Sequence, residues 1–383
     1  MACPLNTPCK HASDQVKLTR YAAIDIGTVT CRLLIGETDG HSVRPLIRRA
    51  IITNLGEDVD ATSILKPEAM ERVFCAVRGF LDIIAHYENA NSNGESADSA
   101  HTTDANAGAG ATSNENATEG GASSMRIIAM ATSAARDAHN ADEFAAGLAK
   151  MGVTLSVIPG EKEAALSFMG ASMDFAGQPI IVTDIGGGST EIIAGIAGQK
   201  PDFAHSFNIG CRRMTERFLT CDPLDSAQVQ ESRQWVRAAF EPYFQNMQQQ
   251  GFHAAHVVSV AGTATSIVSM IERMEVYDSG RVHGYTVTKQ QLDQVFSELS
   301  VKTLDQRMHR VGLQPERASV INAGLIIQQE VLRAAGTNAF VASESDILQG
   351  IILTAAREDA RKTTNKAVHP TKLLYCRNNH TSA

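Results

Sequence analysis

The sequence lacks the cysteine patterns of disulfide-bonded and zinc-binding proteins. Its seven cysteines are odd in number and include no CxxC pair, which favours reduced thiols in a reducing compartment. No apolar run approaches the ~18–20 residues that a membrane span requires. Residues 1–19 also lack the apolar stretch of a secretory signal. These absences predict a soluble, cytoplasmic protein with no membrane association.

Residues 88–124 contain no Leu, Ile, Val, Met or aromatic residue, and no Lys or Arg. A segment with nothing apolar to bury cannot offset the entropy lost on ordering, so it is predicted to be a disordered loop. This segment holds six acids and no base, whereas the whole chain has a formal charge of −8. The net charge therefore does not exclude a polyanionic ligand that is bound by a few local groups.

The rest of the chain alternates apolar strands with amphipathic helices. With 383 residues it is long enough for two domains, and the alternation predicts an α/β architecture with mixed sheets. We expect strands at 125–130, 153–158, 180–185, 190–196 and 255–260, and helices at 67–87, 161–173, 224–250, from 263, within 289–334 and at 345–362.

A weak internal repeat relates residues 23–36 to residues 182–195, at an offset of 159 residues. The repeat aligns Asp25 with Asp184, and each copy has the pattern of a strand, a turn of Gly, Thr or Ser, and a second strand. Backbone N–H groups in such turns approach an anion closely because little side-chain bulk intervenes. Two facing turns therefore predict a cleft that holds a phosphate chain from both sides.

Acidic residues near these turns are candidates for metal binding and base catalysis. An Asp at the start of each turn is available to bind Mg²⁺ or its waters. The second turn is the stronger candidate, because its three consecutive glycines cost backbone entropy that a structural hairpin does not need. Glu163 lies at a helix start, where it is either a base facing the cleft or a partner of the helix dipole. Residues 260–265 are either a helix N-terminal anion site or an ordinary Thr N-cap.

Eight segments together resemble the exopolyphosphatase / guanosine-pentaphosphate phosphatase (Ppx/GppA) family of the actin-like superfamily. They are AAIDIGTVTCRLLIG, MATSAARDAHNADEF, VIPGEKEAALSFMGA, IVTDIGGGSTEIIAG, FNIGCRRMTERFL, VAGTATSI, RVHGY and ERASVINAGLIIQQEVL. The resemblance implies an α/β fold in which two actin-like (ribonuclease H-like) lobes with mixed sheets flank a central cleft. The implied parts are a disordered tail at 1–17, lobe I at 18–158 with the insertion 88–124, lobe II at 159–349, a helix at 350–365 that returns to lobe I, and a tail at 366–383.

The resemblance also implies a role for each matching residue. Glu163 matches the glutamate that activates the attacking water, and Arg136 matches the arginine that reaches the terminal phosphate. Asp184 and Glu191 match acids that surround Mg²⁺ or another divalent cation, and Asp25 is a further expected metal ligand. The expected substrate-binding residues are Gly27, Thr28, Thr30, Gly186, Gly187, Gly188, Ser189, Arg213 and His283.

Two positions depart from the family pattern. Thr28, Val29 and Thr30 replace the usual Ser-Asn-Ser, which removes an amide able to contact phosphate or water. Lys162 and Glu163 replace a pair of glutamates but keep the catalytic position. We therefore expect activity to be retained, with a chain-length or substrate preference that can differ from that of other members.

The function implied by the resemblance is Mg²⁺-dependent hydrolysis of the terminal phosphate of polyphosphate, which releases orthophosphate. One alternative is a 5′-phosphatase of guanosine pentaphosphate (pppGpp) that uses the same site. Others are a catalytically weakened regulator that binds polyphosphate or an alarmone, suggested by Val29, and an actin-like kinase. The resemblance further implies a short family member, a homodimer, and no nucleic-acid partner.

Overall fold

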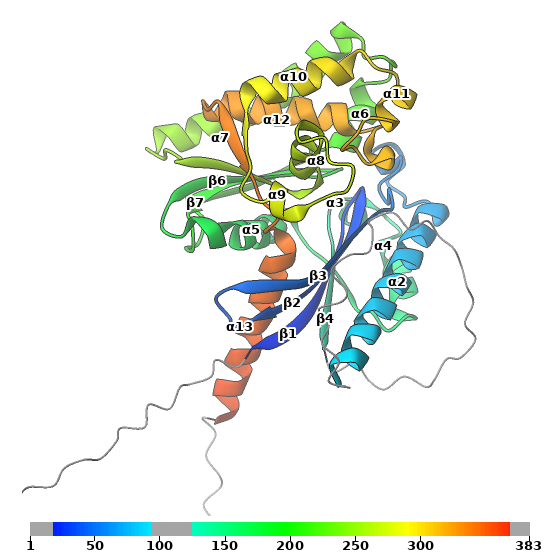
Figure 1. The fold of residues 1–383 in the computed structure, drawn as a ribbon, viewed down its shortest axis with the longest axis vertical. Helices are drawn as coiled ribbons and strands as arrows, with labels where there is room; N and C mark the ends of the chain where they lie inside the picture. Colours follow the sequence, from blue (N-terminus) through cyan, green and yellow to red (C-terminus); the bar gives the residue numbers. More distant parts are fainter. Residues whose placement is uncertain (1–17, 93–124, 368–383) are drawn as a thin grey trace, which may run out of the picture.

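The computed structural model describes residues 18–92 and 125–367, which form two mixed sheets covered by helices (Figure 1). The predicted α/β class with mixed sheets is confirmed. The predicted tail at 1–17, residues 93–124 of the predicted loop and residues 368–383 lie outside the described residues. Within the described part, no helix combines the length and apolar character needed to cross a membrane.

The first lobe is built on a five-stranded sheet of order β3-β2-β1-β4-β5. Strand β2 is antiparallel to both β1 and β3, and β4 and β5 continue the sheet parallel to β1. Its strands are β1 (Thr19–Ile26), β2 (Thr30–Thr38), β3 (Val43–Ile52), β4 (Arg126–Ala131) and β5 (Leu155–Val157), and its helices are α1 (Val59–Thr62), α2 (Pro67–Ser92), α3 (Ser133–Asp137) and α4 (Ala141–Ala149).

The second lobe is built on a six-stranded sheet of order β10-β11-β9-β6-β7-β8. Its strands are β6 (Pro179–Ile185), β7 (Thr190–Ile196), β8 (Phe203–Phe207), β9 (His256–Val260), β10 (Thr286–Thr288) and β11 (Ala339–Ala342). Its helices are α5 (Gly160–Ala171), η2 (Ser172–Phe175), α6 (Cys211–Phe218), α7 (Ser226–Gln249), α8 (Ala261–Ile271), α9 (Ser279–Val282), α10 (Lys289–Ser300), α11 (Leu304–Met308), η3 (Pro315–Arg317) and α12 (Ile321–Ala335).

The predicted repeat is confirmed by the pairing of the strands. In the first copy β1 and β2 are antiparallel, with Asp25 opposite Arg32. In the second copy β6 and β7 are antiparallel, with Asp184 opposite Glu191. In each copy the first strand is also paired in parallel with a later strand, β4 or β9. In each sheet, the turn of the hairpin therefore lies at the carboxyl end of the parallel strands.

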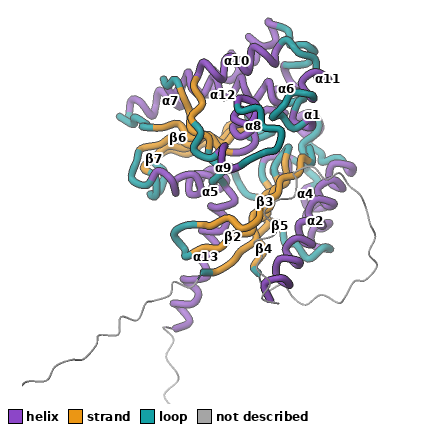
Figure 2. Tube along the Cα trace, viewed as in Figure 1, coloured by secondary structure: helices purple, strands orange, loops and turns teal. Residues whose placement is uncertain are grey.

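Helix α13 (Ile347–Ala367) packs between the two halves of the molecule, against α5 and the first sheet (Figures 1 and 2). Its crossing with α5 is close because the contact points are glycines. A side chain at Gly170 would collide with the Asp346 carbonyl, and one at Gly350 would collide with the Leu166 carbonyl. Since α5 begins three residues before Glu163, this crossing fixes the helix that carries the predicted base.

Two predictions about the elements are wrong, and several strands were not predicted. Helix α2 continues to Ser92, so residues 88–92 are helical; Glu88 there accepts a hydrogen bond of 2.7 Å from the Met125 amide at the start of β4. Helix α13 continues to Ala367 and so enters the predicted tail. Strands β3, β8, β10 and β11 were not predicted, because they are short or, like β3 with its arginines, lack an apolar run.

Candidate active site

Four buried carboxylates gather where the lobes meet. Asp25 comes from β1, Asp184 and Glu191 come from β6 and β7, and Glu163 comes from the first turn of α5. Each is at most 7% exposed. Burial raises the pKa of all four, and repulsion within the cluster raises the pKa of Glu163, Asp184 and Glu191 further. Such a cluster is costly to fold unless a cation or a function requires it.

Arg32 neutralises the first-lobe side of this cluster. Its guanidinium donates to Asp25 Oδ2 from Nη2 at 2.6 Å and from Nε at 3.0 Å, and it also pairs with Asp346 at the start of α13. The sequence repeat aligns Arg32 with Glu191. The two copies of the repeat therefore carry opposite charges at the same place.

Glu163 and Arg136 meet across the boundary between the lobes. Arg136 lies in α3 of the first lobe, and its Nη1 is 3.2 Å from Glu163 Oε2. Burial is the main cause of the raised pKa of Glu163, followed by repulsion from Glu191, Asp184 and Asp25, whereas Arg136 lowers it. A carboxylate with a raised pKa is a stronger base when it is ionised, which suits a group that must take a proton from water.

Hydroxyl groups orient the two acids of the second copy. Ser167 of α5 donates to Asp184 Oδ2 at 3.0 Å, and Ser206 of β8 donates to Glu191 Oε1 at 2.6 Å. Burial, with repulsion from Asp184, raises the pKa of Glu191 to about 8, and burial is the main cause that raises the pKa of Asp184 to about 6. Gly160 leaves room for Ser206, because a side chain at that position would collide with the serine.

The two predicted phosphate loops have the same turn and touch each other. Gly27 N donates to Thr30 O at 3.0 Å, and Gly186 N donates to Ser189 O at 3.0 Å. A Cβ on Gly187 would lie 2.6 Å from Val29 Cγ2 and 2.8 Å from Thr28 Cβ. The glycine therefore allows a close approach of one loop to the other across the lobes.

The glycine loops border a small pocket at the same junction. A Cβ on Gly188 would lie 2.9 Å from Thr28 Oγ1 and would also collide with Ser133 of α3. The pocket is lined by Thr28, Gly56, Val59, Asp60, Ser133, Ala134, Asp137, Gly188, Arg212, Arg213 and Glu216. The expected loop residues are thus brought together with the N-terminal turn of α3, and the acids lie at the base of the same loops.

The carboxylate cluster has the donor chemistry that Mg²⁺ requires. Among the residues that the structure describes, Asp25 Oδ1 has no hydrogen-bond partner, and Glu191 forms no ion pair with a Lys, Arg or His side chain. In the described residues no three carboxylate, His or Cys side chains converge as a ready set of metal ligands. Mg²⁺ is usually held by one or two carboxylates together with waters and substrate phosphates. Asp184, Glu191 and the free oxygen of Asp25 therefore fit a cation that binds with its phosphate ligand.

Two predicted substrate-binding residues have protein partners of their own. Arg213 of α6 contacts the loops, but its guanidinium is bound to Asp60, Asp137 and the Gly188 carbonyl. His283 follows α9, and its Nε2 lies 3.5 Å from Asp174 Oδ2. The ion pair with Asp174 raises the pKa of His283. The structure therefore brings Arg213, but not His283, into contact with the other expected site residues.

Two arginines of the site were not among the predicted residues. Arg32 was detectable from the repeat, because it aligns with Glu191. Arg317 lies in one of the eight segments that resemble the family, but no role was assigned to it, because it comes from a short helix far along the chain and reaches the site only through the fold. Its Nη2 donates to Thr30 Oγ1 at 3.1 Å, and its Nε is buried without a partner. Burial lowers the pKa of Arg317, so this cation would gain from an anion bound at the first loop.

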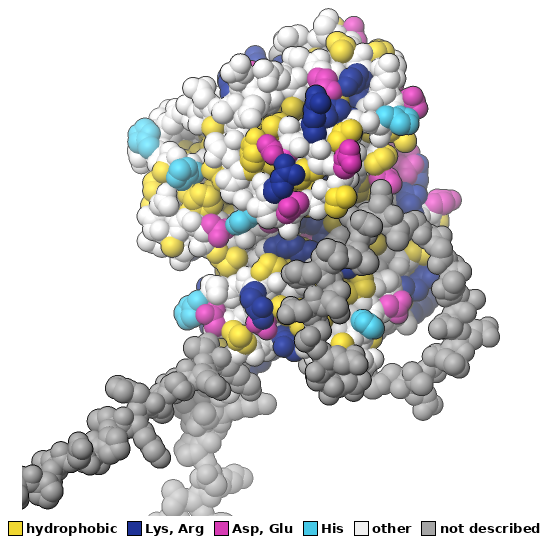
Figure 3. Space-filling view, viewed as in Figure 1, with side chains coloured by type: hydrophobic (Ala, Val, Ile, Leu, Met, Phe, Trp, Pro, Cys, Tyr) yellow, Lys and Arg dark blue, Asp and Glu magenta, His cyan; other side chains and the backbone are white. Residues whose placement is uncertain are grey.

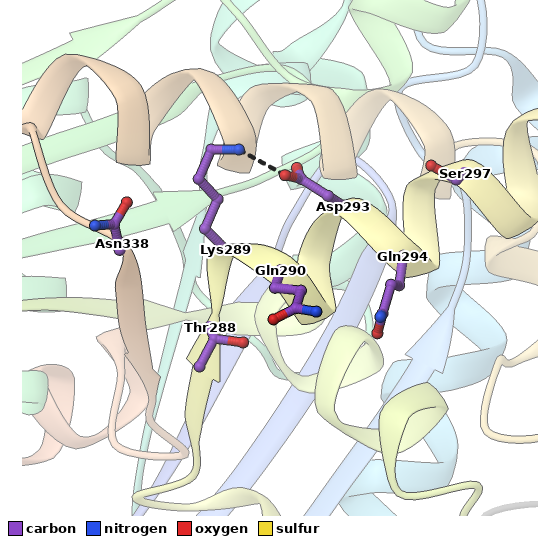
Figure 4. Close-up of a pocket in the computed structure, with 7 residues that line it drawn as sticks. All are labelled: Thr288, Lys289, Gln290, Asp293, Gln294, Ser297 and Asn338. Carbon is purple, nitrogen blue, oxygen red and sulfur yellow. Dashed lines mark hydrogen bonds and ion pairs between the residues drawn. The ribbon is translucent and has the colours of Figure 1, made fainter.

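A second hollow lies on another part of the second lobe (Figure 4). It is lined by Thr288, Lys289, Gln290, Asp293, Gln294, Ser297 and Asn338, and Lys289 pairs there with Asp293 at 2.6 Å. It shares no residue with the carboxylate cluster. The face in Figure 3 shows acidic and basic side chains interspersed over this lobe, with Lys and Arg side chains at the junction between the lobes.

Fold and site together define a two-lobed α/β protein whose cleft is suited to phosphate chemistry. Residues 118–358 match the Ppx/GppA phosphatase family, and the chain belongs to that family. It is 34% identical over 355 residues to Exopolyphosphatase 2 of Mycobacterium tuberculosis, a match that covers 88% of this chain and 99% of that protein.

Solved structures support the same assignment. The structure of an exopolyphosphatase-like protein is 30% identical and superposes with a TM-score of 0.73, covering 90% of this chain and 99% of the other. The Ppx/GppA family member of Aquifex aeolicus is 22% identical with a TM-score of 0.66, over 90% of this chain and 99% of the other, and shares the fold. The predicted family and the predicted fold of two actin-like lobes are confirmed.

Proposed function

We propose that this protein is a Mg²⁺-dependent exopolyphosphatase that removes the terminal phosphate of inorganic polyphosphate. The observation that carries the proposal is the contact of 3.2 Å between Glu163 and Arg136, made across the lobes beside both glycine loops. The identity to Exopolyphosphatase 2 of Mycobacterium tuberculosis over nearly the whole of that protein supports the choice of substrate.

In the proposed reaction Glu163 takes a proton from the attacking water. Its buried position raises its pKa and so makes the ionised carboxylate a stronger base. Arg136 holds the carboxylate in place and offers further N–H groups to the oxygens of the terminal phosphoryl group. Backbone N–H groups of the two loops stabilise the charge that spreads over this group in the transition state. The products are orthophosphate and a chain shorter by one unit.

Asp184, Glu191 and Asp25 would hold the cation in the proposed site. When bound, Mg²⁺ neutralises phosphate oxygens and fixes the orientation of the terminal group. Ser167 and Ser206 keep the two acids of the second copy directed into the cleft. The excess of buried negative charge supports a cation at this point, because Arg32 is bound to Asp25 and Asp346 and leaves Glu191 unpaired.

The proposal is tested by phosphate release from a panel of substrates. The purified full chain is incubated with Mg²⁺ and long-chain polyphosphate, tripolyphosphate or pppGpp, and orthophosphate is measured over time. We expect the highest kcat/KM on polyphosphate, and loss of activity by a factor of about 10²–10⁴ in Glu163→Gln. Glu161→Gln is the matched control, because Glu161 lies in the same helical turn but is exposed.

Each other result assigns a different function. A preference for pppGpp would replace polyphosphate by the nucleotide as the substrate of the same site. Binding of polyphosphate without release of phosphate from any substrate would support a regulator without catalysis. Unchanged turnover in Glu163→Gln would refute the role of Glu163 as the base.

A further inference from the structure

Arg213 joins three segments that are far apart in the sequence. Its Nη1 pairs with Asp60 of α1, its Nη2 is 2.6 Å from Asp137 Oδ2 at the end of α3, and its Nε donates to the Gly188 carbonyl at 2.9 Å. Asp60 and Asp137 belong to the first lobe, whereas Arg213 and Gly188 belong to the second. The Arg213 and Asp60 side chains are only 14% and 16% exposed, so their pairing is weakly screened by water.

Other side chains of α6 strengthen the same contact. Arg217 Nε is 3.0 Å from Asp60 Oδ2, and its guanidinium lies over the Trp235 ring, 5.5 Å from the centroid. Arg212 donates to the Asn54 side chain. One face of α6 therefore binds residues 54–63 of the first lobe, a loop that includes the short helix α1.

The backbone of this loop is left-handed at several residues other than glycine. Asn54, Asp58 and Ser63 have φ angles of 50°, 59° and 54°, a left-handed conformation that costs free energy for residues other than glycine. Lys66 holds the loop from the other side through Glu57 at 3.1 Å. Asn54 and Asp58 of this loop contact α6 directly, because the Asn54 side chain accepts a hydrogen bond from Arg212 and the Asp58 amide donates to Glu216 at 3.4 Å.

The contact is directly coupled to the proposed catalytic groups. Asp137 follows Arg136 in the chain, so one helix of the first lobe is bound to the second lobe twice, through Arg136 to Glu163 and through Asp137 to Arg213. Arg213 also fixes the carbonyl of Gly188 in the second phosphate loop. The small pocket at the loops is lined by Asp60, Asp137, Arg213 and Gly188. Separation of Arg213 from its partners would therefore displace Arg136 and Gly188 relative to each other.

We propose that Arg213, Asp60 and Asp137 form an ion-pair clamp that holds the lobes closed on this side of the cleft and positions Arg136 against Glu163. Arg213 is then a positioning residue that acts through Gly188 and α3, and opening of the clamp admits the substrate. The effect on turnover rests on the proposed function, whereas the effect on lobe separation does not.

The experiment measures the separation of the lobes and the kinetics in the same variants. Cys75 in α2 and Cys221 after α6 are exposed and lie one in each lobe, so they accept spin labels once Cys3, Cys9 and Cys376 are replaced by Ser. Asp60→Asn and Asp137→Asn remove one acceptor each. Glu241→Gln is the control, because it removes a Glu–Arg pair of 2.7 Å within the second lobe.

We expect Asp60→Asn to shift the label distances of the ligand-free protein to larger values, and high salt to do the same to the unsubstituted protein. We expect kcat/KM to fall about tenfold, the effect of one partly buried ion pair, equally on tripolyphosphate and on long chains. Glu241→Gln should change neither the distances nor the kinetics. Asp60→Glu, which keeps the charge, should restore part of the loss.

Three results would overturn the clamp. One is an unchanged distance distribution in both Asp60→Asn and Asp137→Asn, with folding verified by circular dichroism. Another is a gain in kcat/KM that grows with chain length, which would mean that Arg213, once freed from its carboxylates, binds the polyanion directly. The third is an equal response in Glu241→Gln. If the unsubstituted protein hydrolyses no substrate, the proposed function fails while the distance measurement still decides whether the clamp exists.

Discussion

Replacement of Glu191 by Gln should stabilise the ligand-free protein while it impairs the proposed activity. Glu191 is 1% exposed and faces Asp184 without a cation of its own. Burial, with repulsion from Asp184, raises its pKa from 4.5 to about 8. Gln keeps an oxygen able to accept the hydrogen bond from Ser206, which is 2.6 Å long in the present protein. The substitution therefore removes the charge and retains the packing.

The sign and size of the effect follow from this pKa. An acid with a raised pKa in the folded state binds its proton more tightly there, so its contribution to stability is complete below about pH 4.5 and is lost as the pH rises to about 8. At 1.36 kcal/mol per unit, the loss at pH 8 is at most roughly 4 kcal/mol. Partial access of water reduces this penalty, and we expect about 1–3 kcal/mol to be recovered in Glu191→Gln.

Thermal unfolding in EDTA at pH 5 and pH 8 measures the effect. With about 2–4 °C per kcal/mol for lobes of this size, the variant should melt roughly 2–12 °C above the unsubstituted protein at pH 8 and much closer to it at pH 5. Glu161→Gln, an exposed position in α5, should melt like the unsubstituted protein at both. An equal shift at the two pH values, or no shift at pH 8, would refute the reasoning that uncompensated charge destabilises this site.

Three further changes test other parts of the site. Mg²⁺ added after EDTA treatment should raise the Tm of the unsubstituted protein in a saturable manner, and should raise that of Glu191→Gln less; a thermal shift titration measures both. Arg136→Ala should lower kcat by a factor of about 10²–10³. It should also shift the acidic limb of the pH–rate profile to higher pH, because Arg136 lowers the pKa of Glu163. A limb at the same pH as in the unsubstituted protein would contradict the pairing. Gly187→Ala should lower kcat/KM at least about tenfold, because its Cβ would lie 2.6 Å from Val29 Cγ2, whereas Gly79→Ala, which meets open space in α2, should not.

The parts of the structure that follow from local pattern could be predicted from the sequence. Apolar runs and helical spacing identified the central strands and the long helices. The repeat identified the paired hairpins, because a strand, a turn of small residues and a second strand recur with matching acids at positions 25 and 184. Strand β3 could not be identified in this way, since a strand at the edge of a sheet tolerates arginine and proline and has no apolar run.

The parts that depend on contacts between distant segments could not be predicted from pattern. Arg136 was assigned only through the family resemblance, which also decided between the two roles left open for Glu163, and nothing in their local sequence indicates that they meet at 3.2 Å. Arg213 was expected to contact the substrate because of the family resemblance, and the sequence around it does not show that it has partners in the protein. Its acceptors, Asp60 and Asp137, come from two separate elements of the other lobe. The tertiary structure decides which arginines are paired with carboxylates of the protein and which remain available to a ligand.

The two copies of the repeat differ in charge, and this difference assigns them different roles in the proposed site. In the first copy Asp25 faces Arg32, so the carboxylate is neutralised by the protein itself. In the second copy Asp184 faces Glu191, so two buried carboxylates share one hairpin and repel each other. A charge that the protein does not neutralise must be neutralised by a ligand or paid for in stability. The second copy therefore has the charge that the proposed cation would neutralise, and the first copy, with Arg32 and Arg317 beside its loop, is better suited to the proposed anion.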